Sequence, residues 1–317
     1  MAAFALVGDV GGTHARFGLV CQHTGALLHM AVLPVAHFDT LQHALRHYLQ
    51  SQGLNGVQNA CIAVAAPVLG DQVQMINHHW RFSQQALQHE LGFSRMLLVN
   101  DFKAMAMGMT VIAPDSFCTL QQGNGDPQAP RTVIGPGTGL GTAALVRHGD
   151  QWLALPAEGG HVGFAPRDAL DVAVWTRLNE QFGRASVERI LSGPGLLNLY
   201  RAMADIQAQP PVCGDPPSIV EAAKQGDALA SAVAHRFCSI LGSVAGDQVL
   251  ALGARGGVYL CGGLLPRLPF AMVQAAFLEG FMAKGRYQGY VADVPVHLCT
   301  APHAALHGAA ALLSQAA

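Results

Sequence analysis

The most informative part of the sequence is a glycine turn near the start of the chain, which reads Gly8-Asp9-Val10-Gly11-Gly12-Thr13. A second glycine turn in the middle of the chain reads Gly135-Pro136-Gly137-Thr138-Gly139-Leu140-Gly141. Apolar, strand-like runs flank both stretches, at residues 4–7 and 15–20 for the first and at 132–134 and 142–146 for the second. Each stretch is therefore predicted to be the tip of a β-hairpin.

Glycine-rich tips of this kind can bind phosphate. Glycine tolerates φ > 0, so successive backbone N–H groups can turn inward and form a nest of donors for phosphate oxygens. A threonine in each turn, Thr13 or Thr138, and the acid Asp9 in the first favour this interpretation. The alternative is that both turns are ordinary tight hairpins, which also use glycine. Their repetition favours a nucleotide site that is divided between the two turns.

Spacing excludes two better-known phosphate loops. A P-loop requires a lysine directly after its last glycine, and neither turn has one there. A dinucleotide fingerprint opens a helix and is followed by an acid about 20 residues later. Here strand-like residues follow both turns instead.

Length and composition predict a two-domain protein and limit its partners. A chain of 317 residues exceeds one typical core. Charged residues make up only 12%, so the surface must rely on Gln and His or be covered in an oligomer, and we expect a homodimer. The net charge is −2 and the Lys and Arg residues are scattered, which argues against nucleic acid and anionic membranes as partners.

The remaining composition favours a cytosolic protein. Seven widely spaced cysteines without a metal-ligand spacing predict buried, reduced thiols. The N-terminal run lacks a basic segment and is interrupted by Asp9, which is unlike a signal peptide. No stretch of 18 apolar residues is free of charges or turn signals, so we expect no membrane span.

The N-terminal part is predicted to alternate strands and helices. Apolar residues recur at helical spacing over 38–49, and buried strands are predicted at 60–65 and 96–99, with a helix over 102–109. Residues 121–131 are predicted to be a loop that leads into the second hairpin.

The C-terminal part begins its helical region after a proline-rich loop at 208–217. Ser218 and Glu221 have capping-box spacing and predict the start of a helix. The long alanine-rich helix that follows is expected to be broken near Gly242 and Gly246 and to end near Gly253. A strand bracketed by glycine pairs is predicted within 256–263.

Asn100 and Asp101 follow a predicted strand directly and are the first candidates for chemistry. The carboxyl end of a strand in an open α/β sheet is where ligands bind. The alternative is that one of them merely caps the following helix.

Three further sites carry hydrogen-bonding groups or free backbone. Glu158 and His161 flank two glycines; they could bind a metal, but with no further ligand nearby they suit a polyhydroxy ligand better. Glu188 either belongs to a site or is an exposed helix glutamate paired with Arg184 or Arg189. Gly262 and Gly263 either form a plain turn after a strand or allow a flat ring to approach the backbone.

Together, two phosphate nests, an acid at a strand end and several hydrogen-bonding groups predict phosphoryl transfer from ATP to a hydroxyl. Such transfer needs a metal on the phosphates and a base that accepts the hydroxyl proton. Asp101 is the predicted base.

The chain resembles the bacterial glucokinases of the hexokinase and actin-like ATPase superfamily over nearly its whole length. The residues that carry this resemblance are 6–13, 100–102, 137–141, 158–162, 188–195 and Gly262-Gly263. It implies a two-domain α/β fold of the actin-like, ribonuclease H-like type, with ATP and glucose in an interdomain cleft. The implied domains are residues 1–110, joined by a C-terminal helix over 302–317, and residues 111–301.

The resemblance also implies roles for individual residues. Asp101 would take the proton from the glucose 6-hydroxyl, and the other hydroxyls would be held by Asn100, Glu158, His161 and Glu188. ATP would be bound by Gly8, Asp9, Val10, Gly11, Gly12, Thr13, Gly137, Thr138, Gly139, Gly262 and Gly263. Asp9 would lie near a hydrated Mg²⁺.

Two residues depart from the family pattern. His14 stands where asparagine is frequent, and Lys103 places a cation just after the base. The cysteine-rich zinc motif of the related ROK sugar kinases is absent, so the chain is similar to the zinc-free group. The remaining alternatives are a kinase for another hexose and a non-catalytic, sugar-responsive regulatory protein, which an intact Asp101 disfavours.

Overall fold

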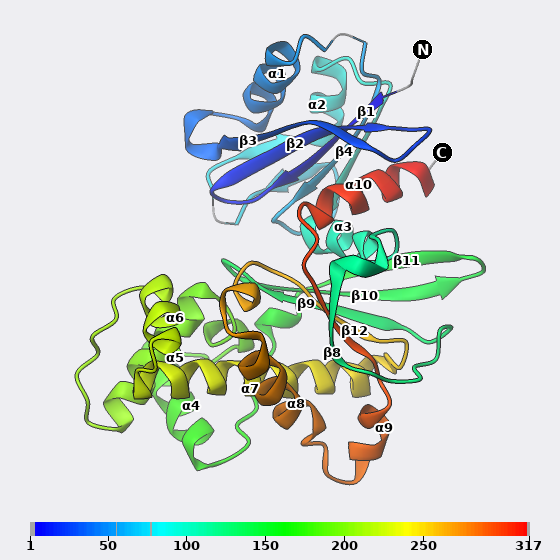
Figure 1. Cartoon of the computed structure of the whole chain (residues 1–317). Helices are drawn as coiled ribbons and strands as arrows, with labels where there is room; N and C mark the ends of the chain where they lie inside the picture. The colour runs from blue at the N-terminus through cyan, green and yellow to red at the C-terminus, as the bar shows by residue number, and fades with distance from the viewer. Residues whose placement is uncertain (1–3, 55, 77, 316–317) are drawn as a thin grey trace. The chain divides into compact units, whose positions relative to one another are not determined.

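The computed structural model describes residues 4–54, 56–76 and 78–315, so the predicted outer limits at residues 1 and 317 lie outside it. Contacts divide the chain into two compact units (Figure 1). The first unit contains the residues up to 114, residues 150–156 and the residues from 301 onward. The second unit contains residues 115–149 and 157–300.

The first large sheet has the strand order β3-β2-β1-β4-β7 (Figure 1). Its strands are β1 (Phe4–Val10), β2 (His14–Cys21), β3 (Leu27–Pro34), β4 (Asn59–Val64) and β7 (Arg95–Asn100). β1, β2 and β3 form an antiparallel meander, and β4 and β7 run parallel to β1. A separate small sheet pairs β5 (Gln72–Gln74) with β6 (Arg81–Ser83). The predicted strands at 60–65 and 96–99 are thereby confirmed.

Helices cover both faces of the first sheet (Figure 1). They are α1 (Leu41–Ser51), α2 (Gln84–Glu90), α3 (Asp101–Gly108) and α10 (Ala304–Gln315), with the short 3-10 turns η1 (Val35–His37) and η2 (Pro114–Ser116). α1 and α2 lie on one face, where Leu45 and Leu87 share a buried core with Leu6. α3 and α10 lie on the other face.

The second large sheet has the order β11-β10-β9-β12-β13-β8. Its strands are β8 (Phe117–Gln121), β9 (Arg131–Pro136), β10 (Leu140–His148), β11 (Gln151–Ala157), β12 (Val258–Leu260) and β13 (Val296–Cys299). β9 and β10 are antiparallel, whereas β12 runs parallel to β9 and to β13. The two sheets have a similar strand order, in which β9 corresponds to β1 and β10 to β2. The two glycine turns therefore lie at corresponding positions, after β1 and after β9.

The helices of the second unit are concentrated around α7. They are α4 (Ala169–Phe182), α5 (Gly193–Ile206), α6 (Pro216–Lys224), α7 (Ala228–Leu252), α8 (Phe270–Met282) and α9 (Gln288–Ala292). Short 3-10 turns lie at η3 (Gly159–His161), η4 (Val187–Arg189), η5 (Leu265–Arg267) and η6 (Gly285–Tyr287). Aliphatic and aromatic side chains of α5, α7 and α8 dominate the buried core.

α7 is continuous, so the predicted breaks near Gly242 and Gly246 were wrong. These glycines allow the backbones of α7 and α8 to approach instead. A Cβ added to Gly242 would lie 1.9 Å from the Phe277 carbonyl oxygen, and one added to Gly280 would lie 1.8 Å from that of Ser239. The predicted end is confirmed, because Gly253 terminates α7 in the left-handed conformation at φ 62°.

The start of α6 also differs from the prediction. Asp215 is the N-cap, and its side chain forms the capping box with Ser218. Pro216 and Pro217 therefore belong to the first turn of the helix, where proline is tolerated because its missing N–H has no partner in the helix. The predicted box between Ser218 and Glu221 was one turn too late.

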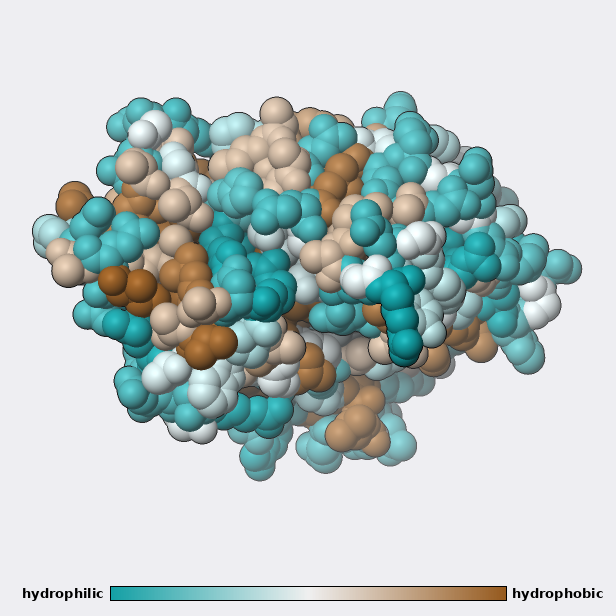
Figure 2. Space-filling view, turned by 90° about the horizontal axis from the view of Figure 1, so that it is seen from below, coloured by the Kyte–Doolittle hydropathy of each residue, from teal (hydrophilic) through white to brown (hydrophobic). Residues whose placement is uncertain are grey.

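The surface carries exposed apolar side chains among its hydrophilic residues. Figure 2 shows hydrophobic groups interspersed with hydrophilic residues over one face. Large apolar side chains that are exposed include Val162, Val172, Leu252, Phe270 and Tyr287. By length and composition α7 is apolar enough to cross a membrane, but 67% of its most apolar window is buried inside the protein, as in a core helix.

All seven cysteines are thiols. Cys21, Cys61, Cys238, Cys261 and Cys299 are buried, as predicted. Burial raises the pKa of Cys61 and of Cys238 to about 12. Cys118 is exposed and Cys213 is half-buried, so the prediction of buried thiols was wrong for these two.

Candidate functional site

The first glycine turn is the tip of the hairpin between β1 and β2, as predicted. Pairing continues to Val10 and Ala15, and the Gly11 N–H donates to the His14 carbonyl oxygen at 3.0 Å. The Val35 N–H donates to the Thr13 carbonyl oxygen at 3.0 Å. The bonds that fix this turn are thus backbone bonds of the sheet and of the chain that follows β3.

The turn glycines do not adopt the backbone conformation that the sequence suggested. None of the glycines at 8, 11, 12, 137 and 139 has a positive φ, so the expectation of inward-turned nests at φ > 0 was wrong. Close packing explains Gly8, because an added Cβ would lie 2.8 Å from Ile62 Cδ1. At Gly137 an added Cβ would meet nothing within 4 Å, which leaves the backbone there accessible to a ligand.

Asp9 lies on β1 just before the first turn and faces a cation. Its Oδ2 is 3.4 Å from Arg16 Nη1, and its side chain is 23% exposed. Burial raises the pKa of Asp9, while Arg16 and His303 act in the opposite direction. A carboxylate in this environment is stabilised by additional positive charge nearby.

Asp101 lies at the same edge of the first sheet as the first turn. Val10, Val64 and Asn100 are in register across β1, β4 and β7. Because β4 separates the other two strands, the ends of β1 and β7 are about 10 Å apart. The sheet therefore brings Asp101 and the turn to one edge, as predicted from the strand ends.

Asn100 is the N-cap of α3. Its Oδ1 accepts from the Phe102 N–H at 2.9 Å and the Lys103 N–H at 3.1 Å, and its Nδ2 donates to the Ala66 carbonyl oxygen at 3.3 Å. Asp101 is the first residue of α3, and its Oδ1 accepts from the Phe102 N–H at 2.9 Å. A helix N-terminus stabilises a carboxylate. The capping alternative thus holds for Asn100, whereas Asp101 is half-buried at the start of the helix.

α3 packs against the C-terminal helix α10. A Cβ added to Gly108 would lie 2.3 Å from the Ala304 carbonyl oxygen, and one added to Gly308 would lie 1.7 Å from that of Ala104. The two helices therefore pack backbone against backbone through a pair of glycines. This contact fixes the position of the helix that begins with Asp101.

The second glycine turn is fastened by segments that follow much later in the sequence. The Gly137 N–H donates to the Gly139 carbonyl oxygen at 2.8 Å, and the Gly193 N–H donates to the Gly137 carbonyl oxygen at 2.7 Å. The Leu140 N–H donates to Glu188 Oε2 at 2.8 Å. A Cβ added to Gly139 would lie 2.5 Å from this Oε2, so glycine is required for the approach of the carboxylate.

Glu158 and His161 lie on a turn that is seated on β10. η3 spans Gly159–His161, and the His161 N–H donates to the Glu158 carbonyl oxygen at 2.9 Å. A Cβ added to Gly160 would lie 2.4 Å from the Leu140 carbonyl oxygen. The paired glycines let the turn lie directly on the strand, and the Glu158 and His161 side chains remain exposed.

Glu188 is joined to the same region, so its interpretation as an exposed helix glutamate was wrong. The Val187 N–H donates to the Val162 carbonyl oxygen at 3.0 Å, and Arg184 Nη2 donates to the His161 carbonyl oxygen at 3.0 Å. Arg189 lies 4.0 Å from the centre of the Phe182 ring. The second unit therefore brings Glu158, His161 and Glu188 together with the turn at 137–139.

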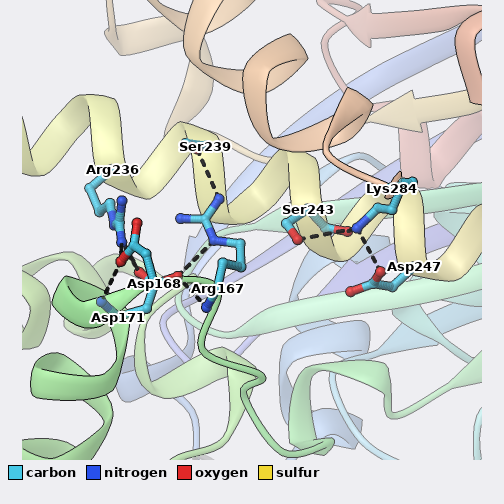
Figure 3. Close-up of polar contacts among 8 residues, drawn as sticks. All are labelled: Arg167, Asp168, Asp171, Arg236, Ser239, Ser243, Asp247 and Lys284. Atoms are coloured by element: carbon cyan, nitrogen blue, oxygen red, sulfur yellow. Dashed lines mark hydrogen bonds and ion pairs between the residues drawn. The ribbon is translucent and has the colours of Figure 1, made fainter. Parts of the chain in front are cut away.

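The segment after His161 ends in an ion-pair cluster on α7 (Figure 3). Asp171 is fully buried and accepts from Arg167 Nε at 2.7 Å and Arg236 Nε at 2.8 Å. Arg167 Nη1 donates to Ser239 Oγ at 2.9 Å. Arg236 also pairs with Asp168, and its hydrogen bond lowers the pKa of Asp168 to about 2. The cluster ties the start of α4 to the middle of α7.

Gly262 and Gly263 follow β12 and differ from each other. Gly262 has φ +91°, and an added Cβ would lie 2.5 Å from the Pro136 carbonyl oxygen, so the turn itself requires glycine. Gly263 has nothing within 4 Å of an added Cβ. The plain-turn alternative accounts for Gly262, whereas Gly263 leaves open space next to the backbone.

Sequence reasoning missed one residue of this region. Thr142 lies in a run that was predicted only as a strand, and its hydroxyl bonds to both sides of Glu158. A hydroxyl among buried strand residues was the available signal. Among the described residues, no three His, Cys, Asp or Glu side chains form a metal-binding group.

Comparison with known proteins places the chain in a family. The glucokinase family model matches residues 6–316. A glucokinase from Chromohalobacter salexigens is 45% identical over 305 residues, which cover 96% of this chain and 96% of that protein. A solved glucokinase from an Antarctic psychrotroph has a TM-score of 0.87 and 35% identity, covering 99% of this chain and 100% of that one.

A more distant solved structure extends the likeness of fold. A ROK family glucokinase from Streptomyces griseus, in complex with glucose and AMPPNP, has a TM-score of 0.69 and covers 98% of this chain and 99% of that one. At 19% identity this likeness shows the fold alone. The family and relative matches span nearly the whole chain, so the predicted resemblance is confirmed and the chain belongs to the glucokinase family.

Proposed function

We propose that this chain transfers the γ-phosphate of ATP to the 6-hydroxyl of D-glucose and releases glucose 6-phosphate and ADP. Membership of the glucokinase family supports the reaction and the substrate. The observation that carries the mechanism is the placement of Asp101 at the same sheet edge as the first glycine turn. That edge combines an acid with backbone suited to phosphate.

Asp101 acts as the general base in this proposal. It accepts the proton of the 6-hydroxyl as the hydroxyl oxygen attacks the γ-phosphorus in line, and the bond from that phosphorus to the β-phosphate oxygen breaks. The N-terminus of α3 keeps the carboxylate ready to accept the proton. Glu158, His161 and Glu188 accept hydrogen bonds from the other hydroxyls or donate to them, and Asn100 combines such a contact with its capping role.

The two glycine turns bind the phosphates. Residues 8–13 and 137–139 supply backbone N–H groups other than those of Gly11 and Gly137, which bond within their own turns. The open space at Gly137 supports an approach of phosphate to the second turn. The adenosine lies along Gly262 and Gly263, where Gly263 leaves the backbone uncovered.

Asp9 fits a hydrated Mg²⁺. Burial raises its pKa, so this carboxylate lacks the full solvation that a nearby cation would replace. Mg²⁺ is commonly bound through one or two carboxylates while it keeps several waters. When bound, Mg²⁺ would neutralise charge on the phosphates. Asp9 would orient its water shell, and Arg16 would balance the carboxylate.

In this proposal the two units correspond, except at residues 111–114, 150–156 and 301, to the two domains of an actin-like, ribonuclease H-like fold. The similar order of the two large sheets supports a duplicated architecture. The domains would be residues 1–110 with the helix over 302–317, and residues 111–301, and their closure over glucose and ATP would exclude water from the γ-phosphate. We further propose a cytosolic homodimer, supported by the free-thiol cysteine chemistry and the low surface charge.

A coupled assay for sugar 6-phosphate tests the function. Wild-type protein, ATP and Mg²⁺ are combined in turn with glucose, mannose, fructose and N-acetylglucosamine, and ADP release is measured in parallel. We expect the highest kcat/KM with glucose. A higher value with another hexose would reassign the substrate, and ADP release that does not depend on any sugar would exclude a sugar kinase.

A further inference from the structure

Thr142 makes two hydrogen bonds that enclose Glu158. Its hydroxyl donates to the Ala157 carbonyl oxygen at 3.0 Å and accepts from the Gly159 N–H at 2.9 Å. These are the backbone groups directly before and after Glu158. One side chain on β10 therefore holds both ends of the Glu158 residue.

The hydroxyl is unusual for its place in the fold. Thr142 is 2% exposed, and it lies in a strand whose neighbours Ala143, Ala144 and Leu145 are buried and apolar. A buried hydroxyl without partners is costly, and both partners of this one come from the Glu158 turn. Nothing else in the described contacts of Thr142 requires a hydroxyl there.

Close packing against β10 restricts the conformation of the turn at residues 158–161. A Cβ added to Gly159 would lie 2.7 Å from Thr142 Oγ1, and one added to Gly160 would lie 2.4 Å from the Leu140 carbonyl oxygen. Glu158 itself has φ −99° and ψ 44°, which is neither helical nor extended. Its backbone conformation is therefore set by the contacts on either side rather than by a regular element.

We propose that Thr142 is a positioning residue for sugar recognition, which fixes the Glu158 backbone and through it the direction of the Glu158 carboxylate. The proposal rests on the proposed contact between Glu158 and glucose. Thr142 itself touches no substrate in this account. Its hydroxyl determines affinity for the sugar. Neither of its two described hydrogen bonds reaches the turn at 137–139, which is held by Glu188 and Gly193.

The chain offers a matched control in the neighbouring strand. Thr132 on β9 is 1% exposed, and its hydroxyl donates to Gln248 Oε1 at 2.6 Å. Replacing it by valine removes a buried threonine hydroxyl from the same sheet but leaves the Glu158 turn untouched. A purely structural role of Thr142 predicts the same behaviour for both valine variants.

The test measures the melting temperature, kcat and the KM for glucose and for ATP in T142V, T132V and E158Q. We expect T142V to raise the KM for glucose roughly 10-fold, because two neutral hydrogen bonds are lost. Its KM for ATP should stay within about 2-fold of wild type. T132V should lower the melting temperature without a change in either KM. An unchanged KM for glucose in T142V, with a raised one in E158Q, would overturn the role of Thr142 alone.

A second pair of variants decides the matter if T142V does not fold. T142S and T142A both lack the methyl group and differ only in the hydroxyl. We expect the serine variant to bind glucose like wild type and the alanine variant to bind it more weakly by roughly 10-fold. Equal glucose affinity in the two variants would overturn the proposal. If E158Q leaves the KM for glucose unchanged, the proposed sugar contact fails, and the role of Thr142 fails with it.

Discussion

The glycine turns at residues 8–13 and 137–139 follow corresponding strands of two similarly ordered sheets, but they are held differently. Backbone bonds of its own hairpin and of Val35 close the first turn. A carboxylate, Glu188, and the start of α5 at Gly193 hold the second. Two similar glycine turns are thus stabilised by different kinds of contact.

The difference suggests that substitutions in the two units affect different kinetic constants. The first turn shares its sheet edge with Asp101, so in the proposed function the same sheet would place both the phosphate and the base. Glu188 holds the second turn through the Leu140 N–H, and in the proposed function the same side chain also contacts the sugar. Changes in the first unit should therefore act mainly on kcat, and changes in the second mainly on KM.

D101N should have the largest effect. The amide cannot accept the hydroxyl proton, so kcat should fall roughly 10²-fold or more. The asparagine can still accept the hydrogen bond from the Phe102 N–H, so α3 should remain in place. Initial rates at saturating glucose and ATP measure this, with D39N, at an exposed aspartate, as the control. Near-normal turnover in D101N would remove Asp101 from the base role.

E188A should affect both substrates. The variant loses the charge-assisted bond to the Leu140 N–H, so the second turn and the sugar site lose a shared contact. We expect the KM for ATP and the KM for glucose each to rise roughly 10- to 100-fold. E188Q, which keeps an acceptor oxygen, should be affected less. A rise confined to one substrate would separate the second turn from the sugar site.

G308A should destabilise the first unit through the contact behind Asp101. The new Cβ would meet the Ala104 carbonyl oxygen at 1.7 Å, so α3 and α10 must move apart. Overpacking of this kind costs about 1–3 kcal/mol of unfolding free energy, measured by urea denaturation. G289A is the matched control, because an added Cβ there meets nothing within 4 Å. Equal stability of the two variants would show that the glycine contact is not needed.

D168N should give the smallest effect, and one that depends on pH. Arg236 lowers the pKa of Asp168 to about 2, so this carboxylate stabilises the fold above its unfolded pKa near 4. The stabilisation is lost as pH falls from about 4 to 2. Asparagine keeps the N-cap of α4 but removes the charge.

The side chain of Asp168 is 50% exposed, so the loss at pH 7 should stay below about 1 kcal/mol. Acid denaturation of both proteins between pH 5 and 2 checks this. The difference in stability should shrink toward pH 2, and a difference that stays constant would exclude the ion pair as its cause.

Local patterns explain what could be predicted from the sequence. Both hairpins, the strand before Asn100 and the end of α7 at Gly253 depend on neighbouring residues, so their signals lie in short stretches. The acid at the strand end was found for the same reason. The family motifs added the candidate roles of Glu158, His161 and Glu188.

Long-range contacts explain what could not be predicted. Gly242 looked like a helix break because its partner, the backbone of α8, is distant in the sequence. Glu188 was open to interpretation as an exposed glutamate because the group that it binds, the Leu140 N–H, is distant in the sequence. The capping box was predicted one turn too late because Pro216 and Pro217 suggested a loop, whereas they begin the helix after Asp215. Thr142 was missed because a hydroxyl among buried strand residues does not reveal its partners, which lie at Ala157 and Gly159.

Equilibrium binding of glucose to D101N and E158Q tests the division between the units most directly. Isothermal titration with glucose separates binding from chemistry. We predict that D101N binds glucose within about 3-fold of the wild-type Kd, whereas E158Q binds it roughly 10-fold more weakly. Normal binding by E158Q, or an equal loss of binding in both variants, would contradict the assignment of the base to Asp101 and of sugar recognition to Glu158.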